Sequence, residues 1–246
     1  MPFDARKWAL SFHGIVDENF AVETDLFQLH IFRKEGIKQI EKNSCKDKLD
    51  IYLPQEWDMA TYRYQEKLRK VMKEEVKERA ETIFQERTDF FASRLNLHYQ
   101  VKAHVTDLGN YYGLCNNVDV KFNFWTICGL PKNCIDYLVC HELAHLFKHG
   151  HYKPFWRIVD MILQGLDDDT TCTGQISYAL DREMRYHLEY SQIRDWGKPT
   201  YLKYWFDSGM AQKDEPFIKV QYAHKGDNFD RIDIYGNKVK SFLATK

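Results

Sequence analysis

Residues 135–156 have the sequence IDYLVCHELAHLFKHGHYKPFW, and we expect the rest of the chain to be built around them. His141 and His145 are spaced i and i+4, so a helix places their imidazoles on one face, where both can bind one metal ion. Glu142 lies roughly 100° further round the helix. Its carboxylate is therefore expected beside the metal ion and not on it.

A third protein ligand is needed, because catalytic zinc takes three such ligands and leaves a fourth position for water. The apolar residues of the stretch predict a helix that is buried in the domain. Gly150 is expected to end this helix, and Pro154 suits the first turn of the next one. His151 then lies in the turn between two helices, from which it can fold back as the third ligand.

Other interpretations of these residues have to be weighed. An HExxH string also arises by chance, and its histidines are then ordinary core residues. The apolar helix, the glycine and the further histidine favour a metal site. His149, near the helix end, is expected to be solvated or to cap the helix. Cys140 points away from His141 and His145, so we expect it to be a buried, inert thiol.

The composition narrows the function classes. The net charge is -1, whereas a protein that neutralises phosphates needs an excess of basic residues. No run approaches the roughly twenty apolar residues of a membrane span, and residues 1–20 do not resemble a secretory signal. The six cysteines form no CxxC pair. We therefore expect a cytoplasmic protein with reduced thiols, no membrane contact and no nucleic acid as its main partner; its oligomeric state is left open.

The N-terminal part is expected to be rich in β-structure. Within residues 1–55, the runs 25–32 and 48–54 alternate in part between apolar and polar residues, which predicts strands. The charged segment 35–47 between them is typical of a turn. This region is expected to pack on the metal-binding domain, and its sequence indicates no chemistry.

Residues 56–170 are expected to form the core domain. Apolar residues recur at helical steps over 57–95, with a break near Thr88–Asp89 that caps a second segment. Strands are predicted at 97–108 and 118–127, joined by a turn-rich link and followed by the metal-binding helix. This order predicts an α+β fold in which the metal-binding helix packs on a small antiparallel sheet.

Residues 171–246 are expected to form an aromatic-rich α/β extension. A helix is predicted at 176–196, and the pattern after Pro199 is typical of a hairpin. The aromatic content argues against a disordered tail, because disorder goes with low hydrophobicity and few aromatic residues. One helix and one hairpin bury too little apolar surface alone, so the extension is expected to pack on the core.

The motifs of the core also resemble a known family. HELAHLFKHGHYKPFW, preceded by DYLV, is similar to the active-site stretch of the YgjP-like metallopeptidases, which are relatives of the SprT-like zinc peptidases and of the wider zincin group. TDLGNYYGLCNN falls where the family has an arginine, tryptophan, glycine, serine, cysteine string, and KFNFWTICGLP where it has a leucine-asparagine strand followed by a proline. Residues that fit are Gly113, Cys115, Asn123 and Pro131; those that depart are Tyr111, Tyr112 and Leu114.

The resemblance, which covers residues 60–165, implies a zincin-like metallopeptidase domain with zinc as its cofactor. By that resemblance Glu142 is the catalytic acid/base, and the metal ligands are His141, His145 and His151. The spacing of the residues selects the same four side chains. The departures from the family pattern indicate a changed substrate preference.

These residues predict a zinc-dependent hydrolase that acts on peptide or protein substrates. Glu142 is expected to take a proton from zinc-activated water, and the strand 118–127 to bind an extended peptide along its edge. A non-catalytic zinc-stabilised domain, which has no need of Glu142, is one alternative. A nucleic-acid-associated SprT-like protease, which needs a basic surface, is another. The group that stabilises the oxyanion stays open among Tyr111, Tyr112, Tyr152 and Tyr178.

Overall fold

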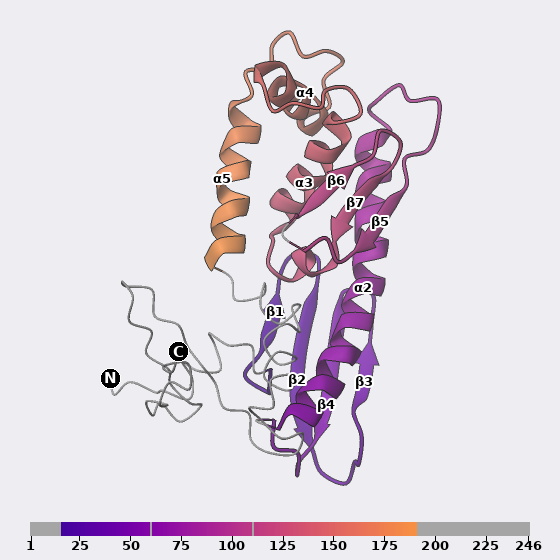
Figure 1. The fold of residues 1–246 in the computed structure, drawn as a ribbon, viewed down its shortest axis with the longest axis vertical. Coiled ribbons are helices and arrows are strands. Elements are labelled where there is room, and N and C mark those ends of the chain that lie inside the picture. Colours follow the sequence, from indigo (N-terminus) through magenta and orange to yellow (C-terminus); the bar gives the residue numbers. More distant parts are fainter. Residues whose placement is uncertain (1–15, 60, 110, 191–246) are drawn as a thin grey trace, which may run out of the picture.

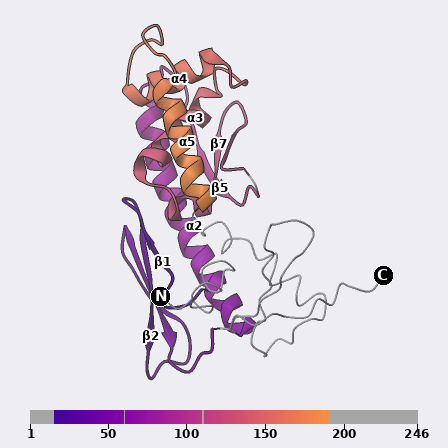
Figure 2. The same ribbon diagram turned by 90° about the vertical axis from the view of Figure 1, so that its left-hand side faces the viewer.

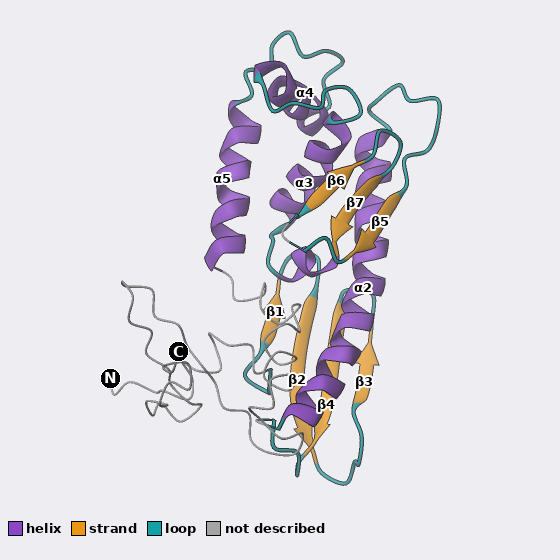
Figure 3. Ribbon diagram, in the orientation of Figure 1, coloured by secondary structure: helices purple, strands orange, loops and turns teal. Residues whose placement is uncertain are grey.

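The computed structural model of the protein describes residues 16–59, 61–109 and 111–190. These residues form an elongated body, with a four-stranded sheet at one end and a three-stranded sheet with three helices at the other (Figure 1). The long helix α2 (Tyr62–Ala92) runs past both sheets. Helices and strands are both well represented (Figure 3), which fits the predicted α+β class. None of the described helices has the length and apolar character that a membrane span requires.

Helix α2 holds the two ends of the body together. Its 31 residues extend over about 46 Å at 1.5 Å per residue. One face carries a fully buried apolar stripe at four-residue steps, and the four-stranded sheet packs beside the first part of the helix (Figure 2). The prediction of a long amphipathic helix is thus confirmed. The members of the stripe are Leu68, Met72, Val76, Ala80 and Phe84.

The predicted break in this helix at Thr88–Asp89 is wrong. Thr88 is completely buried, and the Asp89 carboxylate accepts a hydrogen bond from Gln85 Nε2, one turn earlier, at 2.9 Å. Neither side chain caps a new segment. The helix contacts β5, η1 and α3 in this part of the structure, and such packing outweighs a local capping preference.

The four-stranded sheet has the order β1–β2–β4–β3, with β2 and β4 parallel and the outer pairs antiparallel. The predicted strand at 48–54 is confirmed, whereas the strand predicted at 25–32 begins at Gln28 and ends at Lys34. The expected turn at 35–47 contains a further strand. All four of its residues are exposed, so it has no apolar alternation from which to predict it. The strands are β1 (Ala21–Glu23), β2 (Gln28–Lys34), β3 (Glu41–Ser44) and β4 (Lys48–Pro54).

Side chains of α2 fasten this sheet to the helix. Arg79 Nη2 donates to the carbonyls of Cys45 and Lys48 at 2.8 and 3.2 Å and also bonds to Ser44 Oγ. Glu75 accepts hydrogen bonds from Lys42 Nζ and from Ser44 Oγ. Both polar residues on the helix are buried, and these hydrogen bonds tie them to β3 and to the start of β4.

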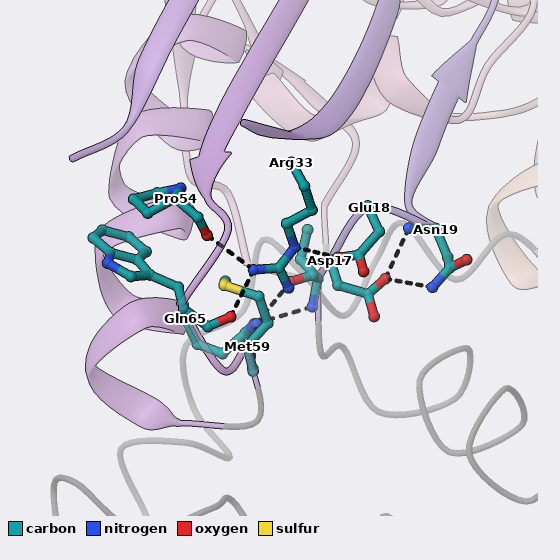
Figure 4. A network of polar contacts seen from close by, with 9 residues as sticks. Asp17, Glu18, Asn19, Arg33, Pro54, Met59 and Gln65 are labelled. Atoms are coloured by element: carbon teal, nitrogen blue, oxygen red, sulfur yellow. Dashed lines mark hydrogen bonds and ion pairs between the residues drawn. The ribbon is translucent and has the colours of Figure 1, made fainter. Parts of the chain in front are cut away.

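A polar network, shown in Figure 4, lies at the N-terminal end of α2. Gln65, which is completely buried, accepts a hydrogen bond from the Val16 amide at 3.0 Å and donates to the Val16 and Met59 carbonyls at 2.7 and 2.8 Å. Arg33 on β2 donates to the Trp57 carbonyl at 2.6 Å and to Glu18 at 2.9 Å. The chain before β1 and the chain before α2 are thereby tied together.

The three-stranded sheet has the order β5–β7–β6, and its strands are β5 (Ala103–Thr106), β6 (Gly113–Cys115) and β7 (Val120–Asn123). It is mixed, with β5 parallel and β6 antiparallel to β7, so the predicted antiparallel sheet is wrong. The link predicted between the strands contains β6. The strand predicted at 118–127 turns after Asn123 into the 3₁₀ helix η1 (Phe124–Cys128), where Thr126 Oγ1 donates to the Asn123 carbonyl at 2.7 Å.

Three helices complete this end, α3 (Lys132–Ala144), α4 (Lys153–Gln164) and α5 (Gln175–Tyr190). Helix α3 contacts α2, α4, α5 and β6, which confirms the predicted buried helix. Pro154 lies in the first turn of α4, as predicted, and Gly165 ends that helix with a left-handed φ of 67°. The predicted helix end at Gly150 is wrong, since the amides of Leu146 and Phe147 bond three residues back in a tightened turn after Ala144.

Helix α5 begins on a buried carboxylate from α4. The Asp160 side chain accepts hydrogen bonds from the Gly174 and Ser177 amides, both at 2.7 Å, and is 1% exposed. It acts as an N-terminal cap supplied from another helix. The predicted helix at 176–196 is confirmed as far as Tyr190, whereas the predicted hairpin and the docking of the rest of the extension lie outside the described residues.

Replacing this cap is expected to loosen α5. Asp160→Ala leaves two buried amides without an acceptor, and we expect it to lower the free energy of unfolding by about 1–3 kcal/mol. Asp160→Asn keeps one acceptor oxygen and is expected to lose less. Urea unfolding and amide hydrogen exchange measure both effects, with exposed Asp167→Ala as the control. Unchanged exchange in α5 of the Asp160→Ala variant would contradict this role.

Candidate metal centre

Three histidines meet where α3 gives way to α4. His141 lies in the last turn of α3, His145 caps the helix, and His151 lies in the connection to α4. Their ligand nitrogens are within 4.8 Å of one another, and His151 Nε2 is 2.9 Å from His141 Nε2. Tetrahedral zinc with bonds of about 2.0–2.1 Å holds its ligand atoms about 3.3 Å apart. The structure thus brings together the three predicted ligands in an arrangement that fits one metal ion.

Hydrogen bonds fix which nitrogen of His141 faces the cluster. The Tyr137 hydroxyl donates to Asp181 Oδ1 at 3.0 Å and lies 3.0 Å from His141 Nδ1. Because the hydroxyl has one hydrogen, His141 Nδ1 carries a proton and donates it to the Tyr137 oxygen. The lone pair of His141 is therefore on Nε2, which points at the other histidines.

The same logic applies to His145. Its Nδ1 lies 2.9 Å from the Lys148 carbonyl oxygen, which only accepts, so Nδ1 is the protonated nitrogen. Burial is the largest cause that lowers the pKa of His141 to about 3, and the neighbouring His145 and His151 contribute to the same shift. Burial also lowers the pKa of His145. Both imidazoles are neutral at pH 7, which is the form that binds a metal.

Aromatic side chains from α4 pack against the three histidines. Phe155 is completely buried, and its ring centroid lies 4.6–4.8 Å from those of the three imidazoles. Trp156 Nε1 donates to the His151 carbonyl at 3.2 Å and so holds the third histidine in place. The sequence showed this Phe-Trp pair in register with the family motif but gave it no role.

Glu142 lies beside the cluster without joining it, as predicted. Its side chain is 4% exposed, and burial raises its pKa to about 8. It packs against Gly113 on β6, where an added Cβ would lie 2.5 Å from Glu142 Oε1. Only glycine therefore allows this close approach of the strand to the carboxylate.

An open cleft of about 680 Å³ leads to the three histidines and Glu142. Its walls come from β6 and the loop before it on one side and from α5 on the other. Of the four tyrosines considered for the oxyanion, Tyr111 and Tyr112 line this cleft, whereas Tyr152 and Tyr178 do not line it. The three departures from the family pattern, Tyr111, Tyr112 and Leu114, all line it.

Asn123 supports the loop on the β6 side. It is completely buried, and its Nδ2 donates to the carbonyls of Tyr111 and Gly109 at 3.0 and 3.4 Å. Its backbone amide donates to the Tyr112 carbonyl at 2.9 Å. The asparagine that matched the family motif thus shapes the loop that lines the cleft.

Two residues of the centre were missed from the sequence. Tyr137 stands one turn before His141, so the i, i+4 spacing that selected the histidines also marks it. Asp181 has no comparable signal, because it meets Tyr137 only through the packing of α5 on α3.

Comparison with known protein families assigns this chain to a family. A family model described as YgjP-like, metallopeptidase domain, matches residues 28–171, so the chain carries a domain of the metallopeptidase type. It belongs to the YgjP-like family, as the motifs of the core indicated. Searches among curated proteins and among solved structures found no match. Membership of a metallopeptidase family implies a metal ion, and the histidine cluster offers ligands for one.

Removing the Tyr137 hydroxyl is expected to weaken metal binding. Tyr137→Phe leaves His141 Nδ1 without its partner, and losses of this kind cost roughly 10–100-fold in metal affinity. Titration with zinc against a competing chelator measures the change. Tyr178→Phe, at an exposed tyrosine outside the cleft lining, is the matched control. Equal affinities in the wild type and Tyr137→Phe would show that the hydroxyl does not orient the ligand.

The raised pKa of Glu142 predicts how the metal-free protein responds to pH. Between its ordinary value of 4.5 and about 8, the carboxyl ionises in the unfolded chain but stays protonated in the folded one. Glu142 therefore makes a contribution to the stability of the wild type that falls as pH rises through this window, by up to a few kcal/mol. The side chain introduced by Glu142→Gln does not titrate. The stability of this variant relative to the wild type is therefore expected to rise with pH.

Urea unfolding of both metal-free proteins at about pH 5 and about pH 8.5 tests this prediction. The free energy of unfolding of Glu142→Gln, minus that of the wild type, should be larger at the higher pH. Glu66→Gln, at an exposed position, controls for the change of net charge. If the difference in free energy of unfolding between the two proteins did not change with pH, Glu142 would ionise as easily in the folded protein as in the unfolded chain.

Proposed function

We propose that the protein is a zinc-dependent metallopeptidase that cleaves peptide bonds in the cleft between β6 and α5. His141, His145 and His151 hold the zinc ion in this proposal, and Glu142 is the general base. The observation that carries it is the convergence of three imidazoles, with the lone pairs of His141 and His145 on Nε2, beside the buried side chain of Glu142, which is not part of the cluster.

Zinc in a three-histidine site supplies Lewis acidity, which makes water a nucleophile near neutral pH and polarises the substrate carbonyl. The charge of a bound metal ion favours the ionised form of Glu142, which would then accept a proton from the attacking water and donate it to the leaving amine. The close packing of its side chain against Gly113 supports this role, because it restricts where the carboxylate can lie.

The predicted peptide-binding strand has to be replaced. The sequence suggested the edge of 118–127, but β7 is the central strand of its sheet and both of its edges are paired. Within the described residues β6 pairs on one side only, and it lies against Glu142. We place the extended peptide along β6, where backbone hydrogen bonds align it. Tyr111 and Tyr112, at the same wall, are the remaining candidates for the oxyanion.

The two alternative functions have less support. A domain that uses zinc only for stability has no need to bury a carboxylate beside the ligands, where its ionisation is unfavourable. A nucleic-acid-associated protease needs a basic surface, and the net charge is -1. All six cysteines are free, which suits the reducing cytoplasm that we propose as the location.

The decisive experiment separates the metal ligands from the base. Relative to the wild type, His141→Ala and His145→Ala should each lose one equivalent of zinc together with peptide hydrolysis. Glu142→Gln should keep that zinc and lose hydrolysis by at least about 100-fold. Elemental analysis and cleavage of an unstructured protein such as casein provide the two readouts.

The control is Glu66→Gln, which changes an exposed carboxylate on α2 away from the cleft lining. It should match the wild type in both measurements. Full turnover by Glu142→Gln would remove this residue from the mechanism, and full zinc content in His141→Ala would remove the metal site.

A further inference from the structure

A second group of metal-binding side chains lies between α3 and α5, apart from the cleft. Cys134 is in the first turn of α3, and Glu183 and His187 are one turn apart on α5. One ligand atom from each lies within 4.8 Å of the other two. Among the described residues two groups of three such side chains converge, and the other is the three-histidine cluster.

The donor set suits a zinc ion. Thiolate, carboxylate and imidazole are the three side-chain ligands that zinc takes in proteins. Thiolate and carboxylate together carry two negative charges, which balance a divalent cation in a partly buried place. The i, i+4 spacing of Glu183 and His187 is the same spacing that directs His141 and His145 to one point.

The surroundings also hold these ligands in position. Asn133 Nδ2 donates to Glu183 Oε1 at 3.1 Å, and Asn133 Oδ1 accepts from the Cys134 amide at 2.9 Å. Cys134 is completely buried, whereas the side chains of Glu183 and His187 are 43% and 38% exposed. A cation from solvent can therefore reach Glu183 and His187 directly, and the buried Cys134 is the third candidate ligand.

We propose that Cys134, Glu183 and His187 form a second zinc site that clips α5 onto α3. When the Sγ–zinc bond forms, the thiol releases its proton to solvent, and no oxidation or reduction takes place. This site goes beyond the proposed peptidase function, since it needs neither the cleft nor Glu142.

The position of the clip gives it a structural role for the cleft. Cys134, Tyr137 and His141 follow one another along α3 at steps of three and four residues, and Asp181 precedes Glu183 on α5. The cap on Asp160 fixes the start of α5, and the clip fixes a point two to three turns further on. Between them lies the Asp181–Tyr137 hydrogen bond that orients His141.

Cobalt substitution distinguishes the two sites, because only a site with a cysteine ligand gives thiolate-to-cobalt charge-transfer absorption in the near ultraviolet. In the full-length protein, we expect about two zinc or cobalt ions per chain and a thiolate band. Cys134→Ser should lower the content to about one and abolish the band. His187→Gln and Glu183→Gln, at partly exposed positions, should weaken binding at this site by at least about tenfold.

The controls separate this proposal from the peptidase function. His141→Ala should lose the other metal ion and keep the thiolate band. Cys115→Ser, which removes a thiol in the cleft lining, and Cys128→Ser, which removes a buried thiol in η1, should both keep it. A wild type without a thiolate band, or a band that survives in both Cys134→Ser and His187→Gln, would overturn the second site and leave the first untouched.

Discussion

The hydrogen bond from His141 Nδ1 to the Tyr137 hydroxyl links the candidate metal centre to the packing of the surrounding helices. It leaves the lone pair on Nε2 and requires the hydroxyl to donate elsewhere, which it does to Asp181. Asp181 belongs to α5, and α5 starts on the buried Asp160 of α4. The orientation of one imidazole therefore depends on three helices, and segments far apart in the sequence have to fold together before the metal centre is complete.

The parts of the fold that the sequence predicts correctly depend on local signals. Pro154 and Gly165 mark the ends of α4 because their backbone preferences act within one turn. The strand at 48–54 was recognised from its alternation. Strands β3 and β6 were missed because they are short edge strands whose pairing partners, and not their side chains, make them strands. Pairing direction is likewise a long-range property, so the mixed three-stranded sheet was not predictable.

The candidate site was predictable to a similar extent. The ligand positions His141, His145 and His151 and the adjacent Glu142 follow from spacing along one helix and the turn after it. The cleft wall opposite them does not follow from spacing along the chain. Gly113 approaches Glu142 only because β6 pairs antiparallel with β7. Cys134 was met as one scattered cysteine among six, and its neighbours Glu183 and His187 lie about fifty residues further along the chain.

Helix α5 links these observations. It supplies one wall of the cleft, the carboxylate behind Tyr137 and two side chains of the second metal-binding group. The family match ends at residue 171, so α5 lies outside the matched residues. Helix α5 lines the cleft, and its contact with Tyr137 on α3 reaches His141 through the Tyr137 hydroxyl. If the cleft binds substrate as proposed, the docking of α5 couples substrate selection to the orientation of His141, and any change that loosens α5 is expected to affect both.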